Sequence, residues 1–208
     1  MNYKEVQFNF YGIDLWNKPF WFELMYANSQ GRDTTSLNTR SKVPLFQWKD
    51  DIIAESDNII NFIETHFPGP SLLPTTLSAP LKSETLLFIQ STLKAISPFK
   101  LLGAPEGERR SALHQELTQA YEHLEQHLRA RPPGPFYLGD SFSLVEAMLF
   151  PYLERAVVVL GHFRGFQIPQ RCPLLSSWFS TMASYPPIQK TRQDPQILIN
   201  AYAKFAPK

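Results

Sequence analysis

A stretch with four prolines, PGPSLLPTTLSAP at residues 68–80, is the feature that most limits how this chain can fold. Proline inside a helix removes a backbone hydrogen bond and clashes with the preceding turn, so no continuous helix can run through this stretch. The residues before it mix strand-like and helix-like patterns, whereas those after it are helical. We therefore predict an N-terminal domain at residues 1–69, a linker at 70–80 and an all-α domain at 81–208.

Strand-like patterns fill much of the first part. Residues 5–15, EVQFNFYGIDL, alternate aromatic and β-branched residues with polar ones, which predicts a strand. Two short apolar runs at 43–48 and 51–55, joined by Lys49 and Asp50, predict a hairpin. Apolar residues at helical spacing over 56–67 predict a helix, with Ser56 as its N-cap.

After the linker, apolar residues recur at three- and four-residue steps, which predicts amphipathic helices. Leu86 and Leu87 belong to the first such pattern, and residues 113–128 carry the second. Ser143 and Glu146 have the spacing of a capping box, in which serine and glutamate satisfy backbone N–H groups at a helix start. A last helix is expected over residues 174–184.

Composition excludes several classes of protein. With 43% hydrophobic residues among 208, the chain can bury a core, and its 20 basic and 19 acidic residues leave a formal charge of +1. Such a balance argues against a nucleic-acid partner. Cys172 is the only cysteine, and no apolar run approaches the roughly 20 residues of a membrane span. We expect a cytoplasmic protein without a membrane span.

Several motifs in order resemble those of the glutathione S-transferase superfamily. They are KVPLF at 42–46, Glu55-Ser56, the linker FPGPSLLP, FYLGDSFSLVEAMLFPYLER at 136–155 and CPLLSSWFSTMASYPPIQKT at 172–191. The resemblance covers about residues 10–195. It implies an α+β two-domain fold, with a thioredoxin-like N-terminal domain and an all-helical C-terminal domain.

The phrase IDLWNKPFWF at 13–22 resembles the second strand and helix of the omega and lambda classes. In that alignment the thioredoxin-like domain is incomplete, because the first strand and helix are missing. A second alignment makes EVQFNFYG the first strand and KPFWFELMYANSQ the first helix. No residue matches the catalytic cysteine of those classes, so thiol transferase chemistry is disfavoured and the catalytic residue is unknown. Tyr3 and Tyr11 are weak alternatives.

The resemblance also implies a glutathione site. In the family the proline of the Val-Pro pair is cis, which exposes backbone groups for an extended peptide, so Val43 and Pro44 are expected to hold the cysteinyl part of glutathione. Ser56 is expected at the γ-glutamyl carboxylate, with Glu55 beside it and Lys42 near the glycine end. The alternative is that Ser56 only caps a helix and Pro44 only forms a turn.

Other candidate sites are less specific. Phe88, Tyr152 and Phe163 are expected to line an apolar pocket for a hydrophobic small molecule in the interdomain cleft, although core packing also explains them. His123 and His127 have a spacing that can hold a metal, but no further ligand accompanies them, and we predict no metal site. The polar residues 31–41 are expected to form a surface loop.

Two functions follow from these patterns. The first is a glutathione transferase-like protein that binds a hydrophobic small molecule and catalyses glutathione addition, removal or a glutathione-assisted rearrangement. The alternative is a non-catalytic carrier or protein-interaction module that has lost the catalytic segment. A homodimer is expected in either case, because an incomplete sheet would leave edges to be covered.

Overall fold

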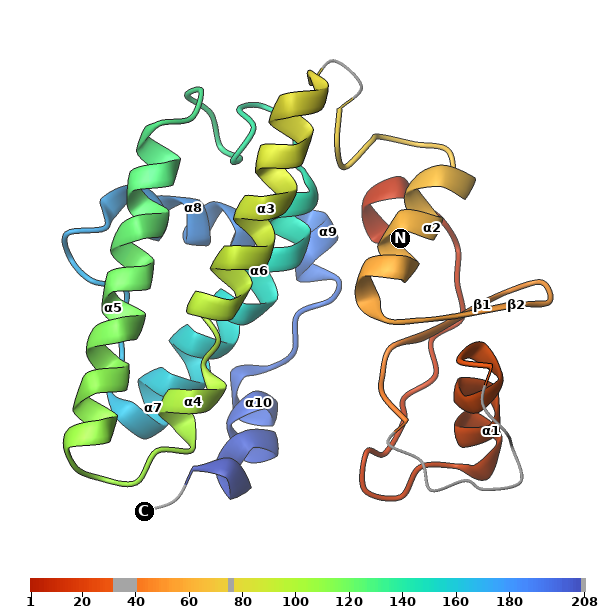
Figure 1. Cartoon of the computed structure of the whole chain (residues 1–208), viewed down its shortest axis with the longest axis horizontal. Helices are drawn as coiled ribbons and strands as arrows, with labels where there is room; N and C mark the ends of the chain where they lie inside the picture. The colour runs from red at the N-terminus through yellow and green to blue at the C-terminus, as the bar shows by residue number, and fades with distance from the viewer. Residues whose placement is uncertain (32–40, 75–76, 207–208) are drawn as a thin grey trace. The chain divides into compact units, whose positions relative to one another are not determined.

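The computed structural model describes residues 1–31, 41–74 and 77–206, and these fall into two compact units, Met1–Pro70 and Ser71–Lys208. The first unit combines a small sheet with helices, and the second is helical (Figure 1). A reduced thioredoxin-like unit followed by a helical unit confirms the predicted fold class. The surface loop expected at residues 31–41 lies almost entirely outside the described residues.

The first unit is built around a β-hairpin. Its elements are η1 (Asn2–Lys4), α1 (Phe20–Ser29), β1 (Leu45–Trp48), β2 (Asp51–Ala54) and α2 (Ser56–His66). Strands β1 and β2 pair in antiparallel register, with Leu45 opposite Ala54. Helix α1 packs against β2, and α2 follows that strand directly. The predicted hairpin and the predicted helix after it are therefore confirmed.

The strand predicted over residues 5–15 is wrong. These residues form no strand in the structure, and the sheet of the described residues contains only β1 and β2. Alternation of apolar and polar residues produces a strand only where a neighbouring strand accepts its backbone hydrogen bonds. Here Phe10 and Tyr11 are 83% and 72% exposed, so the aromatic positions of the pattern face solvent. Both alignments correctly placed a helix near residues 18–30.

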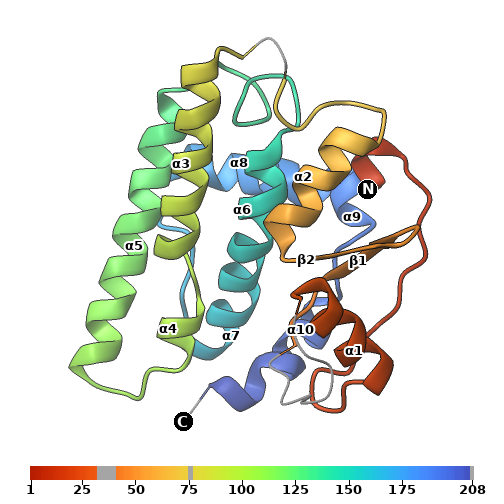
Figure 2. The same cartoon turned by 45° about the vertical axis from the view of Figure 1, so that its right-hand side comes forward.

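The second unit is a helical bundle. Its elements are α3 (Ala79–Ala95), α4 (Phe99–Leu102), α5 (Glu108–Arg129), α6 (Leu144–Arg155), η2 (Ala156–Leu160), α7 (Gly161–Arg164), α8 (Pro173–Ser184), α9 (Pro186–Gln189), α10 (Pro195–Tyr202) and η3 (Ala203–Phe205). Helices α3, α5 and α6 lie side by side in both views (Figure 2). None of the helices in the described ranges is both long and apolar enough to span a bilayer.

The core of the second unit forms where α5, α6 and α8 meet. Tyr121, Leu149, Leu153, Leu175 and Met182 are fully buried there. Part of the apolar pattern predicted for α3 is wrong, because Leu86 and Leu87 are exposed whereas Phe88 and Ile89 are buried. Two adjacent apolar pairs give nearly the same helical periodicity, so the pattern alone did not distinguish which pair faces the core.

Candidate glutathione site

The segment that leads into β1 contains a cis peptide bond between Val43 and Pro44. This confirms the geometry that the Val-Pro motif implied. Because Leu45 lies opposite Ala54, Pro44 comes directly before the first paired residue of β1, and Glu55 comes directly after the last paired residue of β2. The hairpin therefore brings two predicted parts of the site to one end of the sheet.

Glu55 reverses the chain between β2 and α2. Its φ of 69° and ψ of 129° are sparsely populated by residues other than glycine, and such a conformation costs about 1–3 kcal/mol. Glu55 is also the N-cap of α2, and its carbonyl oxygen accepts a hydrogen bond from the Ile59 N–H at 3.0 Å. Ser56 is thus the first residue of the helix, and the prediction that Ser56 is the N-cap was wrong by one position.

The carboxylate of Glu55 has two neighbours. Lys42 Nζ lies 3.5 Å from Glu55 Oε1, and the Tyr26 hydroxyl donates a hydrogen bond to the same oxygen at 3.3 Å. The side chains of Lys42 and Glu55 are 66% and 47% exposed, so the ion pair adds little stability and serves chiefly to position both groups. Tyr26, buried on α1, was missed because no local sequence signal links it to residue 55.

The start of α2 offers donors to an anion. Ser56 is exposed, and Glu55 makes no side-chain hydrogen bond that caps the helix. The first backbone N–H groups of a helix have no partner within it and carry a partial positive charge, so they suit a carboxylate. Asp57 in the first turn already contributes one negative charge there, which opposes a second anion.

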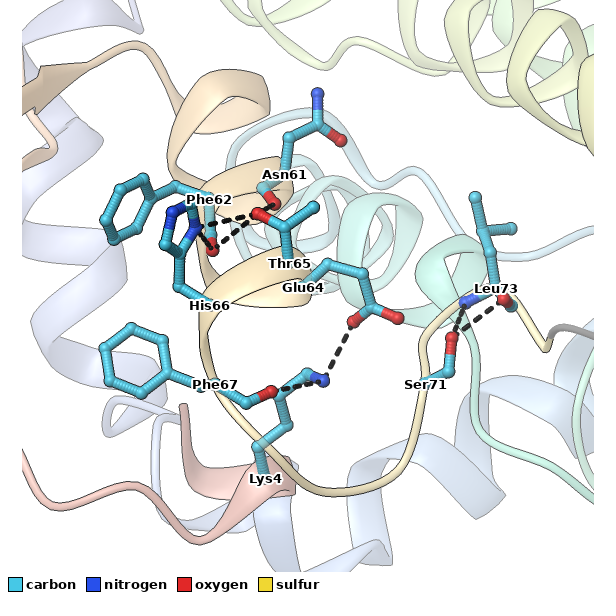
Figure 3. A network of polar contacts seen from close by, with 9 residues as sticks. All are labelled: Lys4, Asn61, Phe62, Glu64, Thr65, His66, Phe67, Ser71 and Leu73. Carbon is cyan, nitrogen blue, oxygen red and sulfur yellow. Dashed lines mark hydrogen bonds and ion pairs between the residues drawn. The ribbon is translucent and has the colours of Figure 1, made fainter.

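The other end of α2 is anchored by a lysine that the sequence analysis missed. Lys4 Nζ lies 3.1 Å from Glu64 Oε2 and donates a hydrogen bond to the Phe67 carbonyl oxygen at 3.3 Å (Figure 3). The Lys4 side chain is only 4% exposed. Phe67 is the C-cap of α2, so this ammonium group satisfies a carbonyl at the negative end of the helix dipole.

The three residues predicted to line a hydrophobic pocket lie on three helices. Phe88 on α3 is buried, with its ring stacked on Tyr137 at a centroid distance of 4.7 Å. Tyr152 on α6 and Phe163 on α7 are half-buried. The ring of Phe88 is thus part of the packing within the helical unit, and the pocket itself stays a prediction.

Cys172 lies at the N-cap position of α8 and is fully buried. Burial raises the pKa of its thiol, and the nearby carboxylates of Glu125 and Glu122 raise it further. Glu125 also accepts hydrogen bonds from the N–H groups of Leu174 and Leu175, at 3.3 and 2.8 Å, and so caps this helix from outside. The thiol is therefore protonated at neutral pH and suited to packing rather than to nucleophilic attack.

The histidine pair lies on α5. The rings of His123 and His127 are 4.6 Å apart, and desolvation, followed by the effects of His123 and Arg131, lowers the pKa of His127. Within the described ranges, no group of three or more histidine, cysteine, aspartate or glutamate side chains is arranged to hold a metal ion.

Comparisons with known proteins identify the family of this chain. The family model described as "Glutathione S-transferase, C-terminal domain" matches residues 107–180. A probable glutathione S-transferase of rice (Oryza sativa subsp. japonica), named DHAR1 and cytosolic, is 30% identical over 206 residues, which cover 99% of this chain and 84% of the relative. The chain belongs to the glutathione S-transferase superfamily.

A second relative and a solved structure are also similar to this chain. Glutathione S-transferase L2, chloroplastic, of Arabidopsis thaliana is 31% identical over 98% of this chain, which spans 63% of that relative's length. The fold matches the crystal structure of glutathione transferase Omega 3C from Trametes versicolor with a TM-score of 0.79 and 21% identity, covering 98% of this chain and 81% of that one. The relatives' names place one in the cytosol and one in the chloroplast, so a cytoplasmic location stays a prediction.

Proposed function

We propose that this protein binds glutathione at the segment from Lys42 to Pro44 and at the start of α2. The observation that carries this proposal is the 3.5 Å approach of Lys42 Nζ to Glu55 Oε1, which brings the segment from Lys42 to Pro44 close to the N-cap residue of α2. Backbone groups of Val43 would pair with the cysteinyl part of the tripeptide, as in strand addition. The Ser56 hydroxyl and the first N–H groups of α2 would hold the γ-glutamyl carboxylate, with Lys42 toward the glycine end.

The proposed activity is a glutathione transfer to or from a hydrophobic molecule, or a rearrangement assisted by glutathione. Its chemistry would rest on holding the two reactants in place and on stabilising the glutathione thiolate with backbone donors. Phe88, Tyr152 and Phe163 stay the candidates for contacting the hydrophobic molecule. Family membership supports the transferase class.

A thermal-shift titration with glutathione tests the binding step, because a ligand that binds only the folded state raises its apparent stability. We expect wild type to shift, and Ser56→Ala to require about five- to tenfold more glutathione for the same shift. Asn61→Ala is the matched control, since Asn61 is exposed on the same helix but lies beyond its first turn. Equal titrations for Ser56→Ala and wild type would contradict the assignment.

The state of Cys172 favours a second candidate, a non-catalytic carrier. The only cysteine of the 208 residues is buried with a raised pKa, so it does not supply the thiolate of a thiol transferase. Turnover of glutathione with a dinitrophenyl halide distinguishes the two proposals. Transfer supports the transferase, whereas no shift and no turnover, with a lipid or pigment bound on purification, supports the carrier.

A homodimer is part of the same proposal. Sizing chromatography with light scattering measures the mass of the species in solution. A mass of about twice 23.9 kDa is expected, and elution as a compact monomer would contradict the prediction.

A further inference from the structure

The segment that joins η1 to α1 has an open backbone. No backbone N–H or C=O group of residues 7–15 takes part in a hydrogen bond with the part of the chain that the structure describes. Each of residues 7–12 is also exposed, and successive side chains of an extended segment point to opposite sides, so water reaches both sides of this stretch. Figures 1 and 2 show it as a tube between η1 and α1. Free donors and acceptors on an extended segment are a template for pairing with another strand.

The side chains of this stretch also suit a strand. Phe8 and Phe10 are two residues apart, which puts both rings on one face of an extended chain. They are 46% and 83% exposed, although burial of an aromatic ring is strongly favourable. The intervening Asn9 is exposed and uncharged. This stretch therefore lacks both a partner for its backbone and a cover for its rings.

The apolar area of the segment is large enough for a protein interface. Six aromatic side chains between residues 8 and 21 are exposed, and a fully accessible aromatic side chain offers about 200 Å². At the exposed fractions found here, the six together leave roughly 800 Å² of their surface in water, which is the area that each partner contributes to a specific interface of standard size. The six are Phe8, Phe10, Tyr11, Trp16, Phe20 and Trp21.

We propose that residues 7–11 pair as an antiparallel strand with the same residues of a second copy of this chain, around a two-fold axis at Asn9. This inference rests on the homodimer of the proposed function and names the contact that holds it together. A two-fold interface is self-complementary, so one segment supplies both partners. In this register Phe8 lies opposite Phe10 of the second copy, and Asn9 lies opposite its own copy.

The register is the one that brings the aromatic rings together. In an antiparallel pair, positions that exchange two hydrogen bonds alternate with positions that exchange none, and the side chains are closer at the latter. If Asn9 is the hydrogen-bonded position, Phe8 and Phe10 occupy the closer ones, where aromatic pairs stabilise a sheet. The uncharged Asn9 also brings no like charges together at the axis.

Backbone and ring variants test the contact by sizing chromatography with light scattering. Asn9→Pro removes the two hydrogen bonds at the axis and should raise the dissociation constant of the dimer about thirtyfold. Asn9→Ala keeps both N–H groups and should assemble as wild type does. Phe8→Ser with Phe10→Ser should weaken the dimer by about a hundredfold or more, whereas Leu86→Ser with Leu87→Ser, an exposed apolar pair on α3, should not.

These outcomes separate the interface from the proposed function. None of the backbone groups of residue 9 is bonded within the described chain, so Asn9→Pro should keep the wild-type thermal shift with glutathione. A dimer that is equally tight in Asn9→Pro and wild type would overturn this interface alone. A monomeric wild type would overturn both the interface and the homodimer, while leaving the glutathione titration to decide the ligand site.

A disulfide cross-link tests the register. Residues directly opposite in a hydrogen-bonded antiparallel pair have Cα atoms about 5.5 Å apart, which suits a disulfide. Asn9→Cys should therefore cross-link two chains on oxidation, whereas Asn17→Cys, exposed but beyond the paired stretch, should not. Cys172 is fully buried and does not compete. Equal cross-linking of both variants, or none in Asn9→Cys, would overturn the proposal.

Discussion

Helices α2 and α6 begin in opposite ways. At α6, the Ser143 hydroxyl accepts a hydrogen bond from the Val145 N–H at 3.2 Å, and Glu146 accepts one from the Ser143 N–H at 2.9 Å, with both side chains fully buried. At α2, neither an N-cap side-chain bond nor burial closes the helix start, and Ser56 is exposed. The chain uses the donors of α6 for its own folding, whereas those at the start of α2 face outward and suit a ligand.

The two helices also differ in where they are held. Glu146 fastens the start of α6 to two other parts of the helical unit, since it also accepts hydrogen bonds from the Tyr137 N–H at 2.6 Å and from Trp178 Nε1 at 3.0 Å. Helix α2 is held at its far end by Lys4, Glu64 and Phe67. A helix that is held at its far end and has an unblocked start suits a preorganised anion site.

The largest effect is expected from Glu146→Ala. It leaves buried donors of Tyr137, Ser143 and Trp178 unpaired, and we expect the free energy of unfolding to fall by about 4 kcal/mol. Urea denaturation measures it, with exposed Glu116→Ala as control and Glu146→Gln as the milder variant. If Glu146→Ala lowered the free energy of unfolding no more than Glu116→Ala does, the start of α6 would not be closed by Glu146, and it would not differ from the start of α2 in this respect.

A smaller loss is expected from Lys4→Met at the anchored end of α2. Removing the ammonium leaves the Glu64 carboxylate, whose side chain is 24% exposed, without its cation, so unfolding should become easier by about 2 kcal/mol. Adding Glu64→Leu should recover part of this loss in a double-mutant cycle. Additive effects would mean that the pair does not anchor the helix.

Replacing Ser143 and Ser56 in turn by alanine compares how much each serine stabilises the start of its helix. Ser143→Ala removes a buried cap and should cost about 1–2 kcal/mol of unfolding free energy. Ser56→Ala should cost less than about 0.5 kcal/mol, because Ser56 is exposed and is not the N-cap. The same denaturation experiment measures both. If Ser56→Ala were the more costly change, the start of α2 would be a structural cap rather than a ligand site.

The smallest effect concerns pH. Desolvation lowers the pKa of His127 in the folded state, with His123 and Arg131 acting in the same direction and Glu84 opposing them. The unfolded chain then binds the proton more readily, so stability should be full above the ordinary pKa of 6.5 and decrease as pH falls below it. His127→Gln should remove this part of the pH dependence. An unchanged pH profile in that variant would show that His127 does not contribute to the pH dependence of stability.

Local patterns predicted the parts of the fold that neighbouring residues determine. The hairpin follows from two short apolar runs with a two-residue connection, and the capping box follows from Ser143 and Glu146 three positions apart. The cis bond at Val43–Pro44 came from the family resemblance, because a Val-Pro pair alone does not specify its isomer.

The features that sequence analysis missed depend on residues far apart in the chain. Lys4 and Glu64 are sixty positions apart, and Tyr26 reaches Glu55 only because α1 packs against β2. The prediction of a strand at residues 5–15 was wrong for the same reason, because a strand forms only beside a neighbouring strand, and no local pattern shows whether that neighbour exists.

Backbone amide NMR with glutathione tests the central claim most directly, namely that the start of α2 and the cis segment form one open ligand site. We expect glutathione to shift the amide signals of Val43, Ser56 and Asp57 most, while those of Ser143, Val145 and Glu146 stay unchanged. Unshifted signals at Val43 and Ser56 under saturating glutathione, or the largest shifts at the start of α6, would contradict it.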